Sequence, residues 1–302
     1  MVISVLRGTA MKKLAIIVAI ALIGTPVFAA DMARKMPVKA PPPPPPAPVY
    51  SWTGWYVGGN AGWGWGNTQE MTNSVANTFC NTTFSGCFLP AQVTLHAFLQ
   101  GVQNFDVKAN GFIGGGQVGH NLQNGAAVWG IEADLQGADI KGTASFANSI
   151  AIAGEPGLFV NTSGSGSQKL EWLGTVRGRV GWLWTPLSLF YVTGGLAYGG
   201  VETNVSFKAS QTPGGCVPTC VATVSSSEST TRVGYTVGGG WEWMFAPQWS
   251  FKAEYLYYNL GHVTLNTAIS VPFNGAPYFG GTFQSTALYD GSIVRGGLNY
   301  HF

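Results

Sequence analysis

Residues 168–184, with the sequence QKLEWLGTVRGRVGWLW, decide the fold of this chain. From Leu170 and Trp172 to Trp184, every second position is apolar or glycine, and most of the positions between them are polar or charged. A period of two residues is that of a β-strand with one apolar and one polar face. The segment therefore predicts a strand that separates two different environments.

Seven further segments along the chain repeat this alternation. They are residues 55–65, 111–122, 129–136, 189–201, 232–244, 251–257 and 294–302. Short turns separate some of them, near residues 124, 186 and 247, and Asn124-Gly125 is a strong hairpin signal. The other connections are long, at about 66–109, 142–167, 203–230 and 261–286. Eight strands with alternating short and long connections predict an all-β fold, an eight-stranded antiparallel up-and-down barrel.

Composition indicates where such a barrel resides. The chain has 302 residues, of which 46% are hydrophobic and 9% charged, far from the roughly 25% charged residues of ordinary soluble domains. After residue 30, no stretch approaches the 18 or so apolar residues of a membrane-spanning helix. Hydrophobicity carried by alternate residues is typical of a transmembrane β-barrel. Outer-membrane barrels have short periplasmic turns and long external loops. We therefore expect three periplasmic turns, four external loops and both termini in the periplasm.

The first thirty residues have the pattern of a secretory signal peptide. Lys12 and Lys13 precede an apolar run at 14–23, and small residues at 26–30 offer a cleavage site. The run is too short for a membrane anchor, and Met11 fits the start of such a peptide better than Met1. Cleavage would leave twelve basic and thirteen acidic residues. No basic stripe remains that could bind nucleic acid.

Residues 31–49 form a separate segment that contains six consecutive prolines at 41–46. Proline runs adopt an extended polyproline II conformation and cannot join a sheet. We interpret the segment as a semi-rigid periplasmic tether before the barrel at 50–302. A ligand for a proline-binding module is the alternative.

Four segments carry a family resemblance: WTGWYVGGNAG at 52–62, GFIGGGQVG at 111–119, GTVRGRVG at 174–181 and VRGGLNYHF at 294–302. The sequence resembles the outer-membrane immunogenic protein (RopB-type) family of α-proteobacterial eight-stranded barrels. The resemblance implies an abundant, surface-exposed outer-membrane protein, often called porin-like, without a known catalytic site. The expected partners are outer-membrane lipid, lipopolysaccharide and the barrel-assembly machinery, and the ligand of the external loops is unknown.

The predicted inward face is rich in charge of both signs. Its members are Glu132, Asp134, Glu171, Glu242, Glu254, Arg177, Arg179, Arg232, Lys252 and Arg295. An eight-stranded barrel is only wide enough for side chains to fill, and buried charges must be paired. Five acids and five bases therefore predict a lumen closed by ion pairs, in a structural surface protein that contributes to envelope integrity. A selective pore, the alternative porin-like reading, would show an excess of one sign.

Other motifs are weaker. Gly114, Gly116 and Gly119 match a phosphate-binding fingerprint, but the strand alternation continues through them. We expect no cofactor. His262, near the fourth external loop, is the one residue that suggests a lipid-modifying barrel enzyme, the least favoured alternative.

The cysteines and the C-terminus complete the predicted sites. Export favours disulfides, and the four cysteines allow three connectivities, of which the local pairs Cys80–Cys87 and Cys216–Cys220 are favoured. A zinc site lacks histidines at suitable spacing. At the C-terminus, an alternating series that ends in an aromatic residue resembles the signal recognised by barrel-assembly machinery. Its residues are Val294, Leu298, Tyr300 and Phe302.

Overall fold

The computed structural model describes residues 50–67, 70–80, 102–151, 156–157, 159–212, 221–273 and 276–302. The predicted signal peptide and tether lie outside these residues. The strands are β1 (Gly54–Gly66), β2 (Glu70–Cys80), β3 (Phe105–Asp106), β4 (Asn110–Asn124), β5 (Ala127–Ala151), β6 (Phe159–Thr185), β7 (Ser188–Thr212), β8 (Val221–Ala246), β9 (Trp249–Phe273) and β10 (Ala276–His301). Within the described residues, no helix is long and apolar enough to span a membrane.

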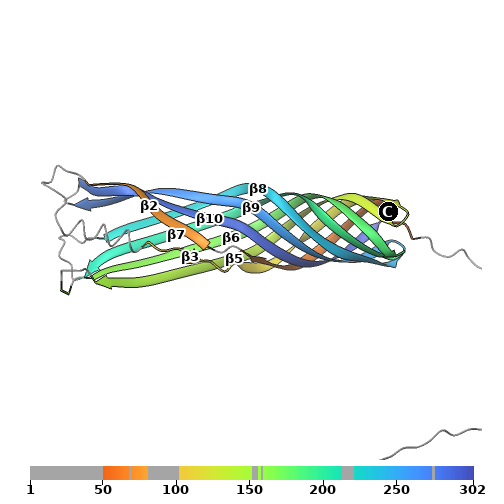
Figure 1. Ribbon diagram of the computed structural model, residues 1–302, viewed down its shortest axis with the longest axis horizontal. Helices are drawn as coiled ribbons and strands as arrows, with labels where there is room; N and C mark the ends of the chain where they lie inside the picture. The colour runs from red at the N-terminus through yellow and green to blue at the C-terminus, as the bar shows by residue number, and fades with distance from the viewer. Residues whose placement is uncertain are drawn as a thin grey trace, which may run out of the picture. The chain divides into compact units, whose positions relative to one another are not determined.

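Eight antiparallel strands form a ring in the order β1-β4-β5-β6-β7-β8-β9-β10 (Figure 1). The ring closes between β1 and β10, from Tyr56 opposite His301 to Gly66 opposite Gly291. Two-residue turns join β4 to β5, β6 to β7 and β8 to β9. The predicted eight-stranded up-and-down barrel is therefore confirmed. The short strands β2 and β3 were not predicted, and β2 pairs with β10 beyond the end of β1.

The strands are longer than the sequence suggested. They continue through most of 142–167, 203–230 and 261–286, which were predicted to be loops; this expectation was wrong for the residues described. β6, for example, has 27 residues, whereas a strand needs about 9–11 to cross a membrane. We call the part of the barrel that contains the first residues of β1 and the last residues of β10 the terminal half, and the opposite part the distal half.

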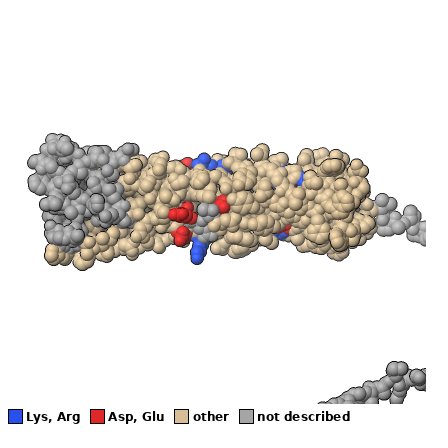
Figure 2. Space-filling view, viewed as in Figure 1, with Lys and Arg blue, Asp and Glu red and all other residues tan. Residues whose placement is uncertain are grey.

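The two halves have opposite polarity. In the terminal half, the outward side chains form an apolar belt. It includes Trp55, Val57, Trp63, Phe112, Val118, Trp129, Leu135, Val176, Trp182, Phe190, Leu196, Val237, Trp243, Phe251, Tyr255, Val294 and Leu298, each 38–63% exposed. In the distal half, the buried core is apolar and the outward residues are mostly Ser, Thr and Asn. Figure 2 shows that most of the visible charged side chains lie in a narrow band between the two regions.

Irregularities in two strands switch the face to which the apolar residues point. In β6, the register shifts between Leu170 and Trp172. On the terminal side of the shift, even-numbered residues such as Val176 face outward. On its distal side, the even-numbered residues Leu170 and Val160 are buried. In β9, Gly261 has a φ of 76°, a value that glycine adopts without strain. Beyond Gly261, the odd-numbered apolar residues turn from the outside to the inside.

The ladder between β8 and β9 ends halfway along the barrel. The register runs from Ala246 opposite Trp249 to Tyr235 opposite Asn259 and stops there, although both strands continue. β7 still pairs with β8, and β9 with β10. The wall thus has two arms here, one that ends with the paired strands β7 and β8 and one that begins with the paired strands β9 and β10. Inward side chains of the two arms pack together: the rings of Phe207 on β7 and Phe283 on β10 stack with centroids 6.1 Å apart. The distal half is thus closed here by an apolar core rather than by backbone hydrogen bonds.

Candidate functional site: the charged lumen

Eight charged side chains meet inside the terminal half. They are Glu132, Asp134, Arg177, Arg179, Glu242, Lys252, Glu254 and Arg295, and each is at most 4% exposed. They come from β5, β6, β8, β9 and β10, because alternation in each strand directs these residues inward. We call this set the ion-pair cluster. Four acids and four bases give it no net charge.

Arg177 is at the centre of the ion-pair cluster. Its Nη1 donates to Glu254 Oε1 at 3.0 Å, and its Nη2 donates to Asp134 Oδ2 at 2.9 Å. Nη2 also donates to Glu132. The Nε group donates to Thr175 Oγ1 at 2.9 Å. One guanidinium therefore links carboxylates from β5 and β9, which face each other across the lumen.

Two other bases repeat this bridging. Arg295 donates through Nε to Glu254 Oε2 at 2.7 Å and through Nη2 to Asp134 Oδ2 at 2.8 Å. Lys252 donates to both carboxylate oxygens of Glu132 at 2.9 Å. Charge-assisted hydrogen bonds of this kind compensate the cost of burying each charge. The cluster crosses the bore as one connected network.

Arg179 extends the network toward the terminal end. Its Nη2 donates to Glu242 Oε2 at 2.7 Å, and its Nη1 donates to the Tyr56 hydroxyl at 2.9 Å. Tyr56 donates in turn to Glu132 Oε2 at 2.6 Å. The guanidinium also lies over the ring of Tyr191, 4.1 Å from its centroid. Aromatic rings thus fill space around the charges and exclude water.

A serine, a histidine and a glutamate also meet here, but not as a catalytic triad. Ser250 Oγ donates to Glu242 Oε1 at 2.6 Å and lies 2.9 Å from His301 Nε2. Ser250 is 0% exposed. A nucleophilic serine gives its proton to the histidine and needs access to substrate. Here the serine hydroxyl donates its hydrogen bond to the Glu242 carboxylate instead, so the arrangement is a structural hydrogen-bond set.

Two residues predicted for the lumen lie elsewhere. Glu171 is in the register shift of β6, which turns it outward, and its carboxylate pairs with Lys169 on the surface at 2.9 Å. Leu170, expected on the lipid face, is buried for the same reason. Arg232 has the inward phase of β8 but lies beyond the last β8–β9 pair and makes no ion pair with a described residue.

Trp52 closes the terminal end. It is 0% exposed and packs in a cluster with Val128, Leu189, Tyr191 and Met244. Its Nε1 donates to the carbonyl of Pro186 at 3.1 Å. Its backbone N–H donates to Gln123 Oε1 at 3.0 Å. These contacts fix Trp52 next to the turns of the barrel, below the ion-pair cluster.

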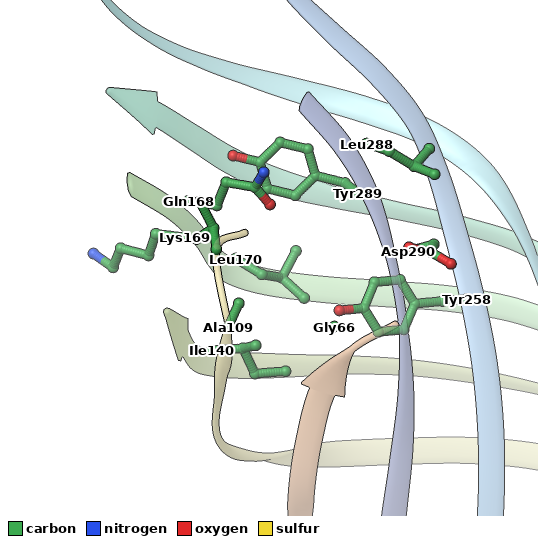
Figure 3. A pocket seen from close by; sticks show the side chains of 11 residues that line it. Gly66, Ala109, Ile140, Gln168, Lys169, Leu170, Tyr258, Leu288, Tyr289 and Asp290 are labelled. Carbon is green, nitrogen blue, oxygen red and sulfur yellow. The ribbon is translucent and has the colours of Figure 1, made fainter. Parts of the chain in front are cut away.

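A small cavity of about 20 Å³ lies on the distal side of the ion-pair cluster (Figure 3). It is lined by Gln168 and Leu170 from β6, Tyr258 from β9, and Tyr289 and Asp290 from β10, among others. The Gln168 Nε2 group has no hydrogen-bond partner among the described residues. The volume suits one or two water molecules and is far below that of a solute-binding pocket.

The remaining predicted site residues are on the surface or outside the description. His262 is exposed on β9, opposite Leu288. Val294, Leu298 and Phe302 face outward, and the Phe302 N–H donates to the Trp55 carbonyl at 3.0 Å. Cys87, Cys216, Cys220 and the side chain of Cys80 lie outside the described residues. The two disulfides therefore stay a prediction.

Sequence reasoning missed the polar partners of the cluster. They are Tyr56, Thr175, Tyr191, Ser250, Asn299 and His301. All have the inward phase of their strands, which was a usable signal. Trp52 precedes the first strand, and nothing in the periodicity indicated its role.

An antiparallel ring with an apolar outer belt and a charged, filled lumen defines a transmembrane β-barrel of the outer membrane. The chain belongs to the family described as outer membrane protein beta-barrel domain, whose model matches residues 40–302. It is 34% identical over 256 residues to a 31 kDa outer-membrane immunogenic protein of Brucella melitensis, covering 83% of this chain and 88% of that protein.

Two further similarities complete the comparison. A 22 kDa outer membrane protein of Rhizobium leguminosarum is 34% identical over 147 residues, covering 47% of this chain and 51% of that protein. Among solved structures, the outer membrane protein OprG of Pseudomonas aeruginosa aligns over 84% of this chain and 99% of its own, with a TM-score of 0.39 and 11% identity. The match to the family model and the identity to the Brucella protein confirm the predicted resemblance to the outer-membrane immunogenic proteins.

Proposed function

We propose that this protein is a non-conducting structural barrel that contributes to envelope integrity and carries its distal half beyond the outer membrane as an exposed surface. The observation that supports this function best is the ion-pair cluster across the bore. A solute that crosses the lumen would have to break these ion pairs, at a cost of several kcal/mol for each buried charge left without a partner. A porin instead keeps a water-filled lumen.

Two further barriers support a closed lumen. Trp52 and its apolar neighbours fill the terminal end. The distal half is filled by an apolar core that includes Phe105, Phe207 and Phe283. A passage would have to cross three layers of different chemistry, so loss of one layer should not open a pore.

The reversed polarity of the distal half supports its exposure to water. Apolar residues face inward and polar residues outward, as in a soluble β-barrel. The six ring strands β5–β10 have 25–27 residues each, more than twice the length that a membrane crossing requires. We place the distal half outside the cell and both termini in the periplasm, because bacterial outer-membrane barrels keep their short turns on the periplasmic side.

A conductance measurement tests the proposal. We expect the purified barrel in planar bilayers to give no steady channel steps, and Trp52→Ala to give none either. Reproducible steps of porin size from the unchanged protein would show that it is a passive diffusion channel.

Protease accessibility tests the orientation. A specific protease site inserted between β7 and β8, at 213–220, should be cut on intact cells. The same site inserted in the two-residue turn between Ala246 and Trp249 should be cut only after the outer membrane is permeabilised. The reverse pattern would contradict the placement. No hydrolysis or acyl transfer is expected with lipid substrates, with or without His262.

A further inference from the structure

The end of the β8–β9 ladder creates a break in the barrel wall. Above Tyr235 and Asn259 the two strands no longer pair, so every second backbone N–H and C=O of each strand is directed toward the break. Side chains with the inward phase of β8 are more accessible beside the break than in the paired part of the strand. In the paired part Thr236 is 1% exposed, whereas beside the break Thr230 and Arg232 are half-buried and Glu228 is exposed.

Arg232 lies at the base of this break and has no partner among the residues that the structure describes. Of the four arginines among the described residues, Arg177, Arg179 and Arg295 are in the ion-pair cluster, and Arg232 is the one with no ion pair or side-chain hydrogen bond. Its Nε is buried and unbonded. Glu228 has the same phase four residues away, about 13 Å along an extended strand, and the two do not pair. A partly buried guanidinium with no counter-charge among the described residues is an incomplete site.

The position of Arg232 along the barrel axis indicates which kind of molecule supplies the missing counter-charge. Val233 and Tyr235, 69% and 50% exposed, are the last apolar outward residues of β8 before Thr231, Ser229 and Ser227. On β9, Tyr257 contacts the Tyr235 ring with centroids 6.2 Å apart, and Asn259 follows. Tyrosines mark the level where acyl chains meet head groups. Arg232 is therefore at head-group level.

We propose that Arg232 binds a phosphate group on the head group of the outer-leaflet glycolipid, lipid A. The guanidinium matches such oxyanions with paired N–H donors, and the free strand edges beside it offer further backbone N–H groups. The break in the β8–β9 ladder gives the head group access from the side. This inference rests on the proposed orientation of the distal half.

Binding in detergent micelles tests the site independently of orientation, so its failure and that of the protease experiment are distinguishable. The probe is bisphosphorylated lipid A, with native mass spectrometry as the readout and dephosphorylated lipid A as the control lipid. We expect Arg232→Ala to weaken binding of the phosphorylated form about tenfold or more and to bring it to the level of the control lipid. Arg232→Lys should retain part of the affinity.

Lys208→Ala is the matched control, because it removes one exposed positive charge from β7 away from the break. It should bind lipid A as the unchanged protein does. All three variants should keep the urea unfolding midpoint, since neither residue is in the ion-pair cluster. Equal affinity of Arg232→Ala and the unchanged protein would overturn the proposal. Displacement of lipid A by an equal concentration of inorganic phosphate would also overturn it, by showing a general anion site.

Discussion

Glu132 and Arg177 occupy directly opposite positions on β5 and β6, and their side chains form an ion pair inside the barrel. Each also binds groups from other strands: Glu132 accepts from Lys252, and Arg177 donates to Glu254. A cross-strand pair is thereby extended into a network that connects opposite sides of the bore. The stability of the barrel and the closure of its lumen depend on the same contacts.

Arg177→Ala should lower the free energy of unfolding by about 3–5 kcal/mol, because removing one partner leaves buried carboxylates uncompensated. Urea titration of the barrel in lipid vesicles measures it. Lys141→Ala is the control: its pair with Asp139 is more than half exposed and should contribute less than about 1 kcal/mol. Equal effects of the two variants would contradict the role of the ion-pair cluster.

Leu298→Arg should cost about 2–4 kcal/mol, since Leu298 lies midway along the apolar belt of β10 and faces outward. Ser225→Arg, an outward substitution in the distal half, should change stability by no more than about 0.5 kcal/mol. Refolding into vesicles at increasing urea compares them. A loss of stability of about 2 kcal/mol or more for Ser225→Arg would show that the distal half faces lipid and not water.

Phe207→Ala should destabilise the protein by about 3–5 kcal/mol, because the ring is 2% exposed in the distal core. A double-mutant cycle with Phe283→Ala should give a coupling of about 0.5–1.5 kcal/mol, as expected for packed aromatic rings. Chemical denaturation followed by circular dichroism provides the values. Additive effects would mean that the two arms of the distal half do not pack together in solution.

Removal of Phe302 should reduce the amount of protein in the outer membrane and lead to periplasmic proteolysis, while the purified chain still folds into vesicles. The residue is 72% exposed and its side chain contacts Tyr300 with centroids 5.2 Å apart, so it contributes little to the core. Cell fractionation and immunoblotting give the readout. Normal outer-membrane levels would leave Phe302 as a member of the aromatic girdle only.

The terminal half was largely predictable from the sequence. Its strands alternate between lipid-facing residues such as Val176 and inward residues such as Arg177, and short turns set the topology. Eight of the ten charges expected inside meet there because strand periodicity alone directs them inward. Their exact pairing was not predictable, since it depends on which strands face each other across the bore.

The distal half was not predictable from the same signal. Its outward residues are Ser, Thr and Asn, which are also typical of loops, and its strands carry shorter apolar patterns. Glu171 was misplaced because a register shift does not change the sequence alternation. The break beside Arg232 could not be predicted, because β8 and β9 keep the residue pattern of strands beyond the point where they stop pairing with each other.

The register shifts in β6 and β9 have a consequence for how this barrel can change its length. Near Gly261, one residue decides whether Val263 and Leu265 face the core or the water. Deleting that residue would turn the remainder of β9 inside out, whereas deleting two neighbours would only shorten it. Natural variation in the distal half should therefore consist of paired insertions and deletions, with single ones confined to the ends of strands.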